Sequence, residues 1–372
     1  MRSVIVIGCD HHNTLGVIRS LGEKGIRPDA VIVSRDGKSF VGKSKYIRKL
    51  HIVCQNSEVT PYLLSHLKQD GEKSVVICCH DGASSEIDLH LDELKEFFIL
   101  PGAEKQGQIT KLMSKQVMSD LAHVCGFSLP KTIYPQHLPL AADEVYLPCI
   151  VKPLVSKNGT KDDIRICENI SEANEAVEKV GIGNVQLQQF IDKDFEYQLI
   201  GVSTGKDVVI PGVSRILRPC KGSNTSFLHY TPLEDDFCDI EKCKEFVRLT
   251  GYHGLFSLEF LRDKNGQDYF MEINFRNDGN AICVTAAGMS LPYIWYLDCL
   301  GNDYSNEANK EIKSVYVMPD MAELKLLVTR QISLREYISD FKKTNRFMEY
   351  DKRDSKPFWK LVIFHICSRL GI

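Results

Sequence analysis

Residues 251–276 read GYHGLFSLEFLRDKNGQDYFMEINFR and carry the clearest structural signal in the chain. At its centre, Asn265-Gly266 is the strongest short hairpin signal, because both central residues of a type I′ turn need a positive φ. The apolar runs 255–261 and 269–275 are therefore predicted to be paired strands. Side chains alternate along a strand, so the second run has two rows that face opposite ways. One row carries the polar groups and the other, expected to be core, is apolar: Phe270, Glu272, Asn274 and Arg276 against Tyr269, Met271, Ile273 and Phe275.

The first strand of the hairpin carries Glu259, which can meet the row that holds Glu272 and Asn274. Like-charged carboxylates on a half-buried sheet repel each other unless a cation lies between them. Hard oxygen ligands of this kind suit Mg²⁺, which takes one or two carboxylates and completes its shell with water and phosphates. The pattern therefore predicts a magnesium site. The alternative is a solvated sheet face with a surface Glu–Arg pair.

An acidic residue on one strand followed by E-x-N-x-R on the next resembles the metal-binding end of ATP-grasp enzymes. That superfamily includes D-alanine–D-alanine ligase, biotin carboxylase and the large subunit of carbamoyl-phosphate synthetase. The layout is most similar to D-aspartate ligase and its bacterial relatives. The resemblance implies that Glu259, Glu272 and Asn274 hold two Mg²⁺ ions, for which Mn²⁺ can substitute. It also implies that Arg276 is catalytic and contacts phosphate or an acyl-phosphate.

Length and composition exclude several other classes. The 372 residues are enough for two or three domains with real cores. A formal net charge of −3 with 26% charged residues gives no basic excess, which argues against nucleic-acid binding. The 13 cysteines lie in apolar runs without a C-x-x-C pair, so we expect free thiols in a reducing cytoplasm. The N-terminus does not read as a signal peptide, and no run reaches the length of a membrane span.

The first 104 residues alternate short apolar strands with helical patterns, which predicts a small doubly wound α/β domain. Its first turn, G-x-D-x-x-N at Gly8, Asp10 and Asn13, resembles the Rossmann-like domain that precedes ATP-grasp in D-aspartate-ligase-like proteins. The resemblance implies an α/β ATP-grasp fold of two α+β lobes clasping ATP at 105–305. Its N-lobe is expected to run from about 105 to 190 and its C-lobe from about 191 to 305, with 306–372 as a C-terminal extension.

One motif points elsewhere. Residues 37–44, GKSFVGKS, satisfy the phosphate-binding P-loop pattern G-x-x-x-x-G-K-S. The P-loop mechanism needs a long helix that starts at Lys43, so that its N-terminal amides face the phosphates. After Ser44 the chain reads KYIRKLHIVC, whose alternation predicts a short strand. We therefore expect a basic surface loop, and a P-loop NTPase or kinase that uses Lys43 is the alternative.

The resemblance also assigns the phosphate-binding groups. Lys115 lies on a helix expected over 108–126 and corresponds to the first phosphate lysine, with a solvated lysine as the alternative. Lys152 ends the apolar strand 147–153, where a lysine would be costly to bury without an anion, and corresponds to the second. Backbone amides near Ser156 and Gly159 would form the flap over the phosphates, although this loop has less glycine than the superfamily pattern.

The strand 185–191 resembles the one that leads into the adenine hinge, so backbone groups near Gln189 and Phe190 would read the adenine edge. Glu196 lies where the superfamily places a ribose-binding glutamate, with a surface strand residue as the alternative. Arg215 is a candidate for the substrate carboxylate or the acyl-phosphate, since arginine binds such anions bidentately. Arg218 and Lys221 are weaker candidates for the same role.

The resemblance, which covers about residues 1–300, implies an ATP-dependent carboxylate–amine ligase. A substrate carboxylate attacks the γ-phosphoryl group to give an acyl-phosphate and ADP, and an amine then displaces phosphate to form an amide bond. The partners are small molecules, with an amino acid or a small carboxylic acid as the acid. The alternatives are the P-loop enzyme, an ATP-binding module without turnover and, among ligases, carbamoyl-phosphate-synthetase-like chemistry on bicarbonate.

Beyond the hairpin, residues 280–296 are predicted to form one helix packed under the site. Residues 357–372, PFWKLVIFHICSRLGI, form an amphipathic end that Lys360, His365 and Arg369 interrupt, so it cannot span a membrane. Such a segment can dock on the protein itself, on a partner protein or at a membrane surface. The oligomeric state is left open.

Overall fold

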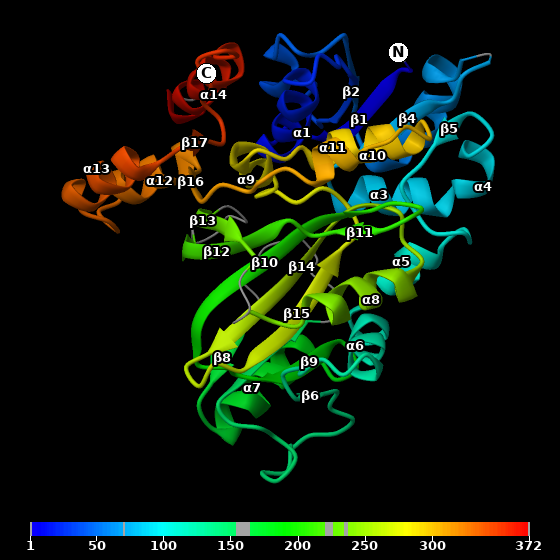
Figure 1. The fold of residues 1–372 in the computed structure, drawn as a ribbon. Coiled ribbons are helices and arrows are strands. Elements are labelled where there is room, and N and C mark those ends of the chain that lie inside the picture. Colours follow the sequence, from blue (N-terminus) through cyan, green and yellow to red (C-terminus); the bar gives the residue numbers. More distant parts are fainter. Residues whose placement is uncertain (1, 70, 154–163, 220–225, 234–236, 371–372) are drawn as a thin grey trace. The chain divides into compact units, whose positions relative to one another are not determined.

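The computed structural model describes residues 2–69, 71–153, 164–219, 226–233 and 237–370 (Figure 1). The chain divides into two compact units. The first unit comprises residues 1–121, 197–259 and 272–372, and the second comprises residues 122–196 and 260–271. The chain therefore leaves the first unit twice, and the second excursion is the tip of the predicted hairpin.

A five-stranded parallel sheet forms the N-terminal part of the first unit, in the order β3-β2-β1-β4-β5 (Figure 1). Its strands are β1 Val4–Cys9, β2 Asp29–Val33, β3 Lys49–Val53, β4 Ser74–Cys78 and β5 Phe98–Ile99. On β1, Val4 and Val6 pack on one face of the sheet, while Ile5 and Ile7 pack on the other. A strand buried on both faces needs apolar side chains throughout, so the doubly wound α/β arrangement explains the unbroken apolar runs.

Helices cover both faces of this sheet. One face packs against helices from both ends of the chain: α1 His12–Gly22, α9 Ile282–Ala287 and α10 Leu291–Cys299. The other face packs against α2 Val59–Tyr62, the π-helical turn η3 Leu63–Leu67, α3 Asp81–Leu89 and α4 Leu91–Leu94. Two 3₁₀ turns connect the early strands, η1 Val41–Lys43 and η2 Asn56–Glu58. One face of the N-terminal sheet is therefore covered partly by α9 and α10, which lie far from it in the sequence.

An eight-stranded sheet carries the hairpin, in the order β15-β14-β10-β12-β13-β16-β17 with β11 paired to β10. Its first five strands in the chain are β10 Lys193–Ser203, β11 Val208–Val209, β12 Gly212–Pro219, β13 Ser226–Pro232 and β14 Gly254–Asp263. The remaining three are β15 Asp268–Asn274, β16 Val315–Met318 and β17 Arg346–Phe347. The predicted pairing of the two runs is therefore present as β14 and β15.

The hairpin differs from its prediction in two details. Only Gly266 has a positive φ (85°) at the turn, so it is not type I′; instead, the Asp263 carboxylate accepts hydrogen bonds from the backbone amides of Asn265 (2.8 Å) and Gln267 (2.9 Å). The apolar row is also less buried than expected, because Tyr269 and Met271 are only partly covered. In the second unit, Phe270 from the opposite row is buried against Phe127 and Phe260 instead.

The second unit contains a four-stranded antiparallel sheet in the order β6-β9-β7-β8. Its strands are β6 Thr132–Ile133, β7 Cys149–Pro153, β8 Arg165–Cys167 and β9 Val185–Gln189. Helix α7 Ile170–Val180 buries Ala173, Ala176 and Val177 against this sheet. The Asn169 side chain caps α7 by accepting from the Glu172 amide at 3.0 Å, which fixes where the helix begins.

The other helices are α5 Gln108–Leu112, α6 Lys115–Val124, α8 Ile240–Thr250, α11 Ser305–Ala308, α12 Asp320–Val328, α13 Leu334–Lys343 and α14 Lys356–Leu370. Two predicted helices are each broken in two. The helix over 108–126 is interrupted between α5 and α6, and the helix over 280–296 is interrupted between α9 and α10. In the second case Gly288, with φ 121°, ends α9. Among the described residues, no helix is long and apolar enough to cross a membrane.

Candidate active site

Three neighbouring strands of the eight-stranded sheet bring polar side chains together in the first unit. Glu259 lies on β14, Asn274 on β15 and Gln198 on β10. The Asn274 Nδ2 donates to Glu259 Oε1 at 3.0 Å, and the Gln198 Nε2 donates to the same oxygen at 3.1 Å. Two amide groups therefore orient one carboxylate, and Gln198 is a part of this arrangement that the sequence pattern did not predict.

Negative charge outweighs positive charge around Glu259. Burial, together with the nearby carboxylates of Glu272 and Asp278, raises the pKa of the Glu259 carboxyl to about 8. The hydrogen bond from Gln198 and the charge of Arg276 oppose this rise and are too weak to cancel it. A divalent cation would reverse the balance, because it stabilises the ionised carboxylates directly.

Arg276 connects the hairpin to the N-terminal sheet within the first unit. Its side chain is only 15% exposed and forms an ion pair with Asp81 (3.0 Å) at the start of α3 and another with Asp278 (3.4 Å). Its Nη2 also donates to Asn274 Oδ1 at 3.0 Å. The carboxylates beside the guanidinium raise its pKa against the effect of burial, so Arg276 is a fixed cation. The predicted residues Glu259, Asn274 and Arg276 thus form one continuous network.

Residues 277–280, NDGN, extend this network and were not predicted. Asp278 accepts from the Ser257 hydroxyl at 3.0 Å and from the Asn280 amide at 2.8 Å. The Asn280 Nδ2 donates to Gln198 Oε1 at 2.9 Å, which closes a ring of contacts around Glu259. The only sequence signal was a short polar run directly after an apolar strand, a pattern that is also typical of an ordinary loop.

The oxygen atoms of this network fit Mg²⁺. Glu259, Glu272 and Asp278 supply hard carboxylate oxygens, and Asn280 Oδ1 is buried without a hydrogen-bond partner. Among the described residues, no three Asp, Glu, His or Cys side chains converge closely enough to hold a metal ion unaided. A bound Mg²⁺ would therefore need amide, water or phosphate oxygens to complete its shell, which is how this ion is usually held.

The predicted nucleotide-binding residues lie mostly in the second unit. The Lys152 Nζ donates to Gln188 Oε1 at 2.8 Å between neighbouring strands β7 and β9. The amides of Gln189 and Phe190 donate to the carbonyls of Lys131 (2.8 Å) and Pro148 (2.9 Å), so neither amide is free for an adenine edge in this conformation. Glu196 is partly exposed and pairs with Lys193.

The remaining predicted residues have simpler surroundings. Lys115 is the exposed first residue of α6, and Arg215 is exposed on β12; both belong to the first unit. Arg218 is held by Glu323 (2.9 Å) and Asp340 (2.6 Å), so it serves an internal ion-pair cluster rather than a substrate anion. Ser156, Gly159 and Lys221 lie outside the described residues.

The P-loop pattern at 37–44 does not form a P-loop. Only the single turn η1 forms there, and a second turn at residues 44–47, rather than a long helix, leads into β3. The Asp10 carboxylate accepts hydrogen bonds from the Ser39 hydroxyl (2.6 Å) and from the amides of Phe40 (2.9 Å) and Val41 (3.0 Å). An acidic side chain therefore occupies the amides that a P-loop would offer to phosphate.

His80, next to the Asp81 that binds Arg276, makes the fold sensitive to acid. Burial lowers the pKa of His80 from 6.5 to about 4, its Nε2 lies 2.7 Å from Asn56 Oδ1, and its Nδ1 is buried without a partner. Because the folded-state pKa is depressed, the contribution is fully present above pH 6.5 and is lost as the pH falls toward 4. Between pH 7 and pH 5 the loss from this residue should be about 2 kcal/mol.

Urea unfolding of wild type and His80→Gln at the two pH values measures this loss. The variant should lose about 2 kcal/mol less stability than the wild type on acidification. His253→Gln, a substitution of an exposed histidine, is the matched control and should follow the wild type. Equal pH dependence in all three proteins would contradict the prediction.

Comparisons with known proteins bear on the fold. No protein-family profile matches the chain. Formate-dependent phosphoribosylglycinamide formyltransferase from Wolinella succinogenes is 27% identical over 143 residues, which is 37% of this chain. The match spans only 36% of that protein's length.

Solved structures match over most of the chain. L-amino acid ligase from Bacillus licheniformis superposes with a TM-score of 0.62 at 17% identity, covering 84% of this chain and 78% of its own. N5-carboxyaminoimidazole ribonucleotide synthetase from Thermotoga maritima gives 0.60 at 13% identity, with 85% and 79% covered. Biotin carboxylase from Campylobacter jejuni gives 0.63 at 14% identity, with 84% and 74% covered. The chain therefore has the ATP-grasp fold preceded by a Rossmann-like sheet, and the predicted fold class is confirmed.

Proposed function

We propose that this ATP-grasp chain is an ATP-dependent carboxylate–amine ligase. The observation that carries the proposal is the Glu259 carboxylate, which Asn274 and Gln198 orient beside the acids Glu272 and Asp278. A divalent cation would suit this cluster, because mutual repulsion and burial both raise the pKa of Glu259 and a cation would offset both effects. The fold similarity to L-amino acid ligase and N5-carboxyaminoimidazole ribonucleotide synthetase supports the same chemistry.

The residues of the first unit would act on the transferred phosphoryl group. Glu259, Glu272 and Asn274 would hold two Mg²⁺ ions, with Mn²⁺ as a substitute, and these ions would neutralise phosphate charge. Arg276 is already fixed by Asp81 and would stabilise the acyl-phosphate without reorganising. Arg215 would bind the carboxylate of an amino acid or small organic acid. Lys115 would contact a phosphate of ATP.

Four further residues, all in the second unit, are proposed to contact the nucleotide. Lys152 would bind the α- and β-phosphates, which requires its ammonium group to exchange Gln188 for an anion. Groups near Gln189 and Phe190 would contact the adenine, and Glu196 the ribose. The division into a Rossmann-like domain at 1–104, an ATP-grasp domain at 105–305 and an extension at 306–372 is part of this proposal.

A charge-removing substitution at Lys152 tests the nucleotide site. Lys152→Met should weaken Mg²⁺-ATP binding about 10- to 100-fold, since a charge-assisted hydrogen bond to phosphate is lost. Lys43→Ala should leave ATP binding unchanged, because the Asp10 carboxylate already accepts hydrogen bonds from backbone amides within the P-loop pattern. Isothermal titration calorimetry measures both variants. Loss of binding in Lys43→Ala with normal binding in Lys152→Met would reverse the assignment.

A panel of acids and amines tests the reaction itself. ADP release in the presence of Mg²⁺-ATP should depend on one acid and one amine, and the product should contain a new amide bond. Release with bicarbonate as the only acid would instead indicate carbamoyl-phosphate-like chemistry. ATP binding without ADP release for any pair would favour a binding module that has lost turnover.

A further inference from the structure

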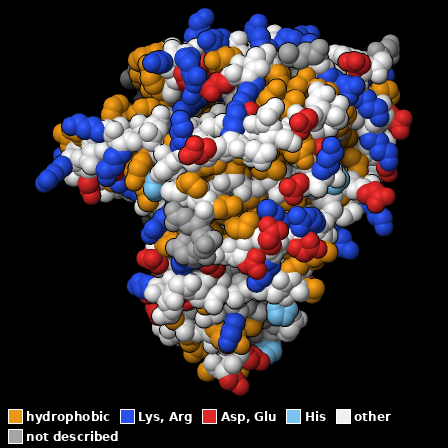
Figure 2. All heavy atoms as spheres, in the orientation of Figure 1, with side chains coloured by type: hydrophobic (Ala, Val, Ile, Leu, Met, Phe, Trp, Pro, Cys, Tyr) orange, Lys and Arg blue, Asp and Glu red, His pale blue; other side chains and the backbone are white. Residues whose placement is uncertain are grey.

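Two helices in the C-terminal part of the first unit each expose a row of large apolar side chains. In Figure 2, hydrophobic side chains are visible at the upper left, over the region of these helices. The first stripe lies on α13, where Leu334, Ile338 and Phe341 are 61%, 44% and 49% exposed. The second lies on α14, where Trp359, Ile363 and Ile366 are 57%, 51% and 53% exposed. Each set has the spacing i, i+4, i+7, which places its members on one face of a helix. We call these two sets the C-terminal apolar stripes.

Both helices are fixed to the protein by other residues. On α14, Leu361 and Phe364 pack against the core cluster that contains β1 and α10, so the exposed stripe is a second apolar face of that helix. Helix α13 begins at a capping box formed by Ser333 and Glu336, and its Tyr337 packs against α12. The stripes are therefore apolar side chains that stay exposed although both helices already pack against the protein through other residues.

The charge around the stripes is one-sided. Exposed cations lie on α12, α13 and α14 and on the segments that join them: Lys325, Arg330, Arg335, Lys342, Lys343, Lys352 and Lys356. Among the described residues from 320 to 370, Glu336 is the one exposed acid. Residues 355–372 contain no Asp or Glu. The local charge is therefore positive although the whole chain has a formal net charge of −3.

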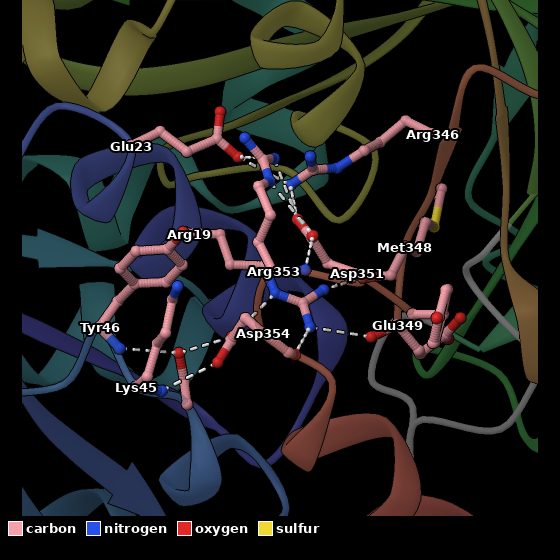
Figure 3. Close-up of polar contacts among 12 residues, drawn as sticks. Arg19, Glu23, Lys45, Tyr46, Arg346, Met348, Glu349, Asp351, Arg353 and Asp354 are labelled. Carbon is pink, nitrogen blue, oxygen red and sulfur yellow. Dashed lines mark hydrogen bonds and ion pairs between the residues drawn. The ribbon is translucent and has the colours of Figure 1, made fainter.

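Most other acidic side chains of this region are not exposed because they form ion pairs with arginines. Asp354 is buried against Arg19 at 3.1 Å, and Asp351 pairs with Arg346 and Arg353 at 3.0 Å (Figure 3). The acids Glu323 and Asp340 are bound by Arg218 on β12. These acidic side chains are therefore paired with arginines, whereas the lysines of this region remain exposed.

We propose that the C-terminal apolar stripes and their lysines dock the protein on an anionic lipid surface. Exposed Trp, Phe, Leu and Ile on one side with Lys and Arg beside them are the features of helices that lie in a membrane interface. Anionic headgroups attract such cations, and the apolar side chains then enter the acyl boundary. This inference does not depend on the proposed ligase activity.

A second copy of the chain fits this surface less well. A two-fold contact places the same patch on both sides, so the lysines of one copy would face those of the other. Like charges at close range oppose association, and no exposed acid other than Glu336 is available among the described residues 320–370 to compensate. An anionic bilayer complements both the charge and the apolar stripes.

The chain contains its own reporter for the test. It has two tryptophans, of which Trp295 is 4% exposed and Trp359 is 57% exposed. The full chain is mixed with vesicles of phosphatidylcholine that contain about 30% phosphatidylserine, or with pure phosphatidylcholine. We expect a blue shift of Trp359 fluorescence and co-sedimentation with the anionic vesicles. Both signals should fall at least about tenfold on neutral vesicles or in about 1 M salt.

Matched variants separate the stripes from general hydrophobicity. Ile363→Ser/Ile366→Ser keeps Trp359 and should weaken binding at least about tenfold, and Leu334→Ser/Ile338→Ser tests the other stripe. The control, Ile166→Ser/Leu249→Ser, removes side chains that are 54% and 55% exposed elsewhere and should bind like the wild type. Circular dichroism and urea unfolding check that each variant is folded.

Three outcomes would overturn the proposal: no binding of the wild type to anionic vesicles, equal binding to neutral ones, or equal binding of all variants. A dimer in light scattering that Ile363→Ser/Ile366→Ser abolishes, without any vesicle binding, would assign the stripes to a second copy instead. Binding that requires both anionic lipid and the apolar stripes is the result that supports lipid docking.

Discussion

Glu272→Gln should lower substrate-dependent ADP release at least about 100-fold while leaving the protein folded. The substitution keeps the size of the side chain and removes one of the carboxylates proposed to hold Mg²⁺. Phosphoryl transfer depends on positioning and on neutralising charge that develops at the phosphates, so the loss falls mainly on the rate of turnover. The measurement is the rate of ADP release with Mg²⁺-ATP and the acid and amine found in the panel.

The same substitution makes a second, independent prediction about stability. Glu272 raises the pKa of Glu259 through repulsion, so the neutral glutamine should lower that pKa and should not destabilise the metal-free protein. A variant that is inactive and unfolded would therefore not count in favour of a metal ligand. The matched control is Glu93→Gln, which changes an exposed glutamate on α4 and should keep full activity. Near-full activity of Glu272→Gln would show that the metal assignment is wrong.

The strands of this fold could be predicted because their burial dictates their composition. β1 and β4 are covered on both faces and need apolar residues throughout, which a sequence displays directly. The hairpin was also predicted, although its turn was not. The Asn-Gly preference reflects only the backbone conformations that these two residues favour. Here the Asp263 carboxylate accepts hydrogen bonds from two backbone amides and stabilises a different turn.

Helix boundaries were harder for an equally physical reason. The apolar periodicity of 108–126 continues across the break between α5 and α6, and neither proline nor glycine marks it. The Asp88 carboxylate on α3 accepts from the backbone amides of Ile109 (3.3 Å) and Thr110 (2.7 Å) and fixes the start of α5 at Gln108, where the pattern also placed it. The break at residues 113–114 has no such signal in the sequence, so two helices were predicted as one.

The candidate site shows the same limit. Glu259, Asn274 and Arg276 belong to one hairpin and its exit, so their proximity follows from strand pairing. Gln198 comes from β10, which the strand order places beside β14, and Asp81 comes from the start of α3; both are distant from the hairpin in the sequence. Arg218 shows the same limit: its charge is visible in the sequence, but its partners Glu323 and Asp340 lie more than a hundred residues away, so the ion pairs could not be predicted.

Arg19→Met should destabilise the first unit by about 3–5 kcal/mol, because it leaves a buried carboxylate without its cation. Arg19 is 1% exposed on α1, and its guanidinium binds the Asp354 carboxylate and the backbone carbonyls of Met348, Glu349 and Asp354 (Figure 3). Asp354 keeps the Ser44 hydroxyl at 2.7 Å and the Lys45 amide at 2.8 Å, which are too few donors to replace a positive charge. The cost is therefore the unpaired charge together with three carbonyls that lose their donor.

Urea unfolding of the full chain measures this cost, and the tryptophan of α14 reports on the segment directly after Asp354. Lys264→Met is the matched control, since it breaks an ion pair whose partners are 64% and 70% exposed and should change stability by less than about 1 kcal/mol. Adding Asp354→Asn to Arg19→Met should restore part of the loss, because the buried charge is then removed as well. The opposite result, a double variant less stable than Arg19→Met, would mean that Asp354 stabilises the fold through Ser44 and Lys45 rather than through Arg19. The cost of Arg19→Met would then come only from the three backbone carbonyls that lose their hydrogen-bond donor.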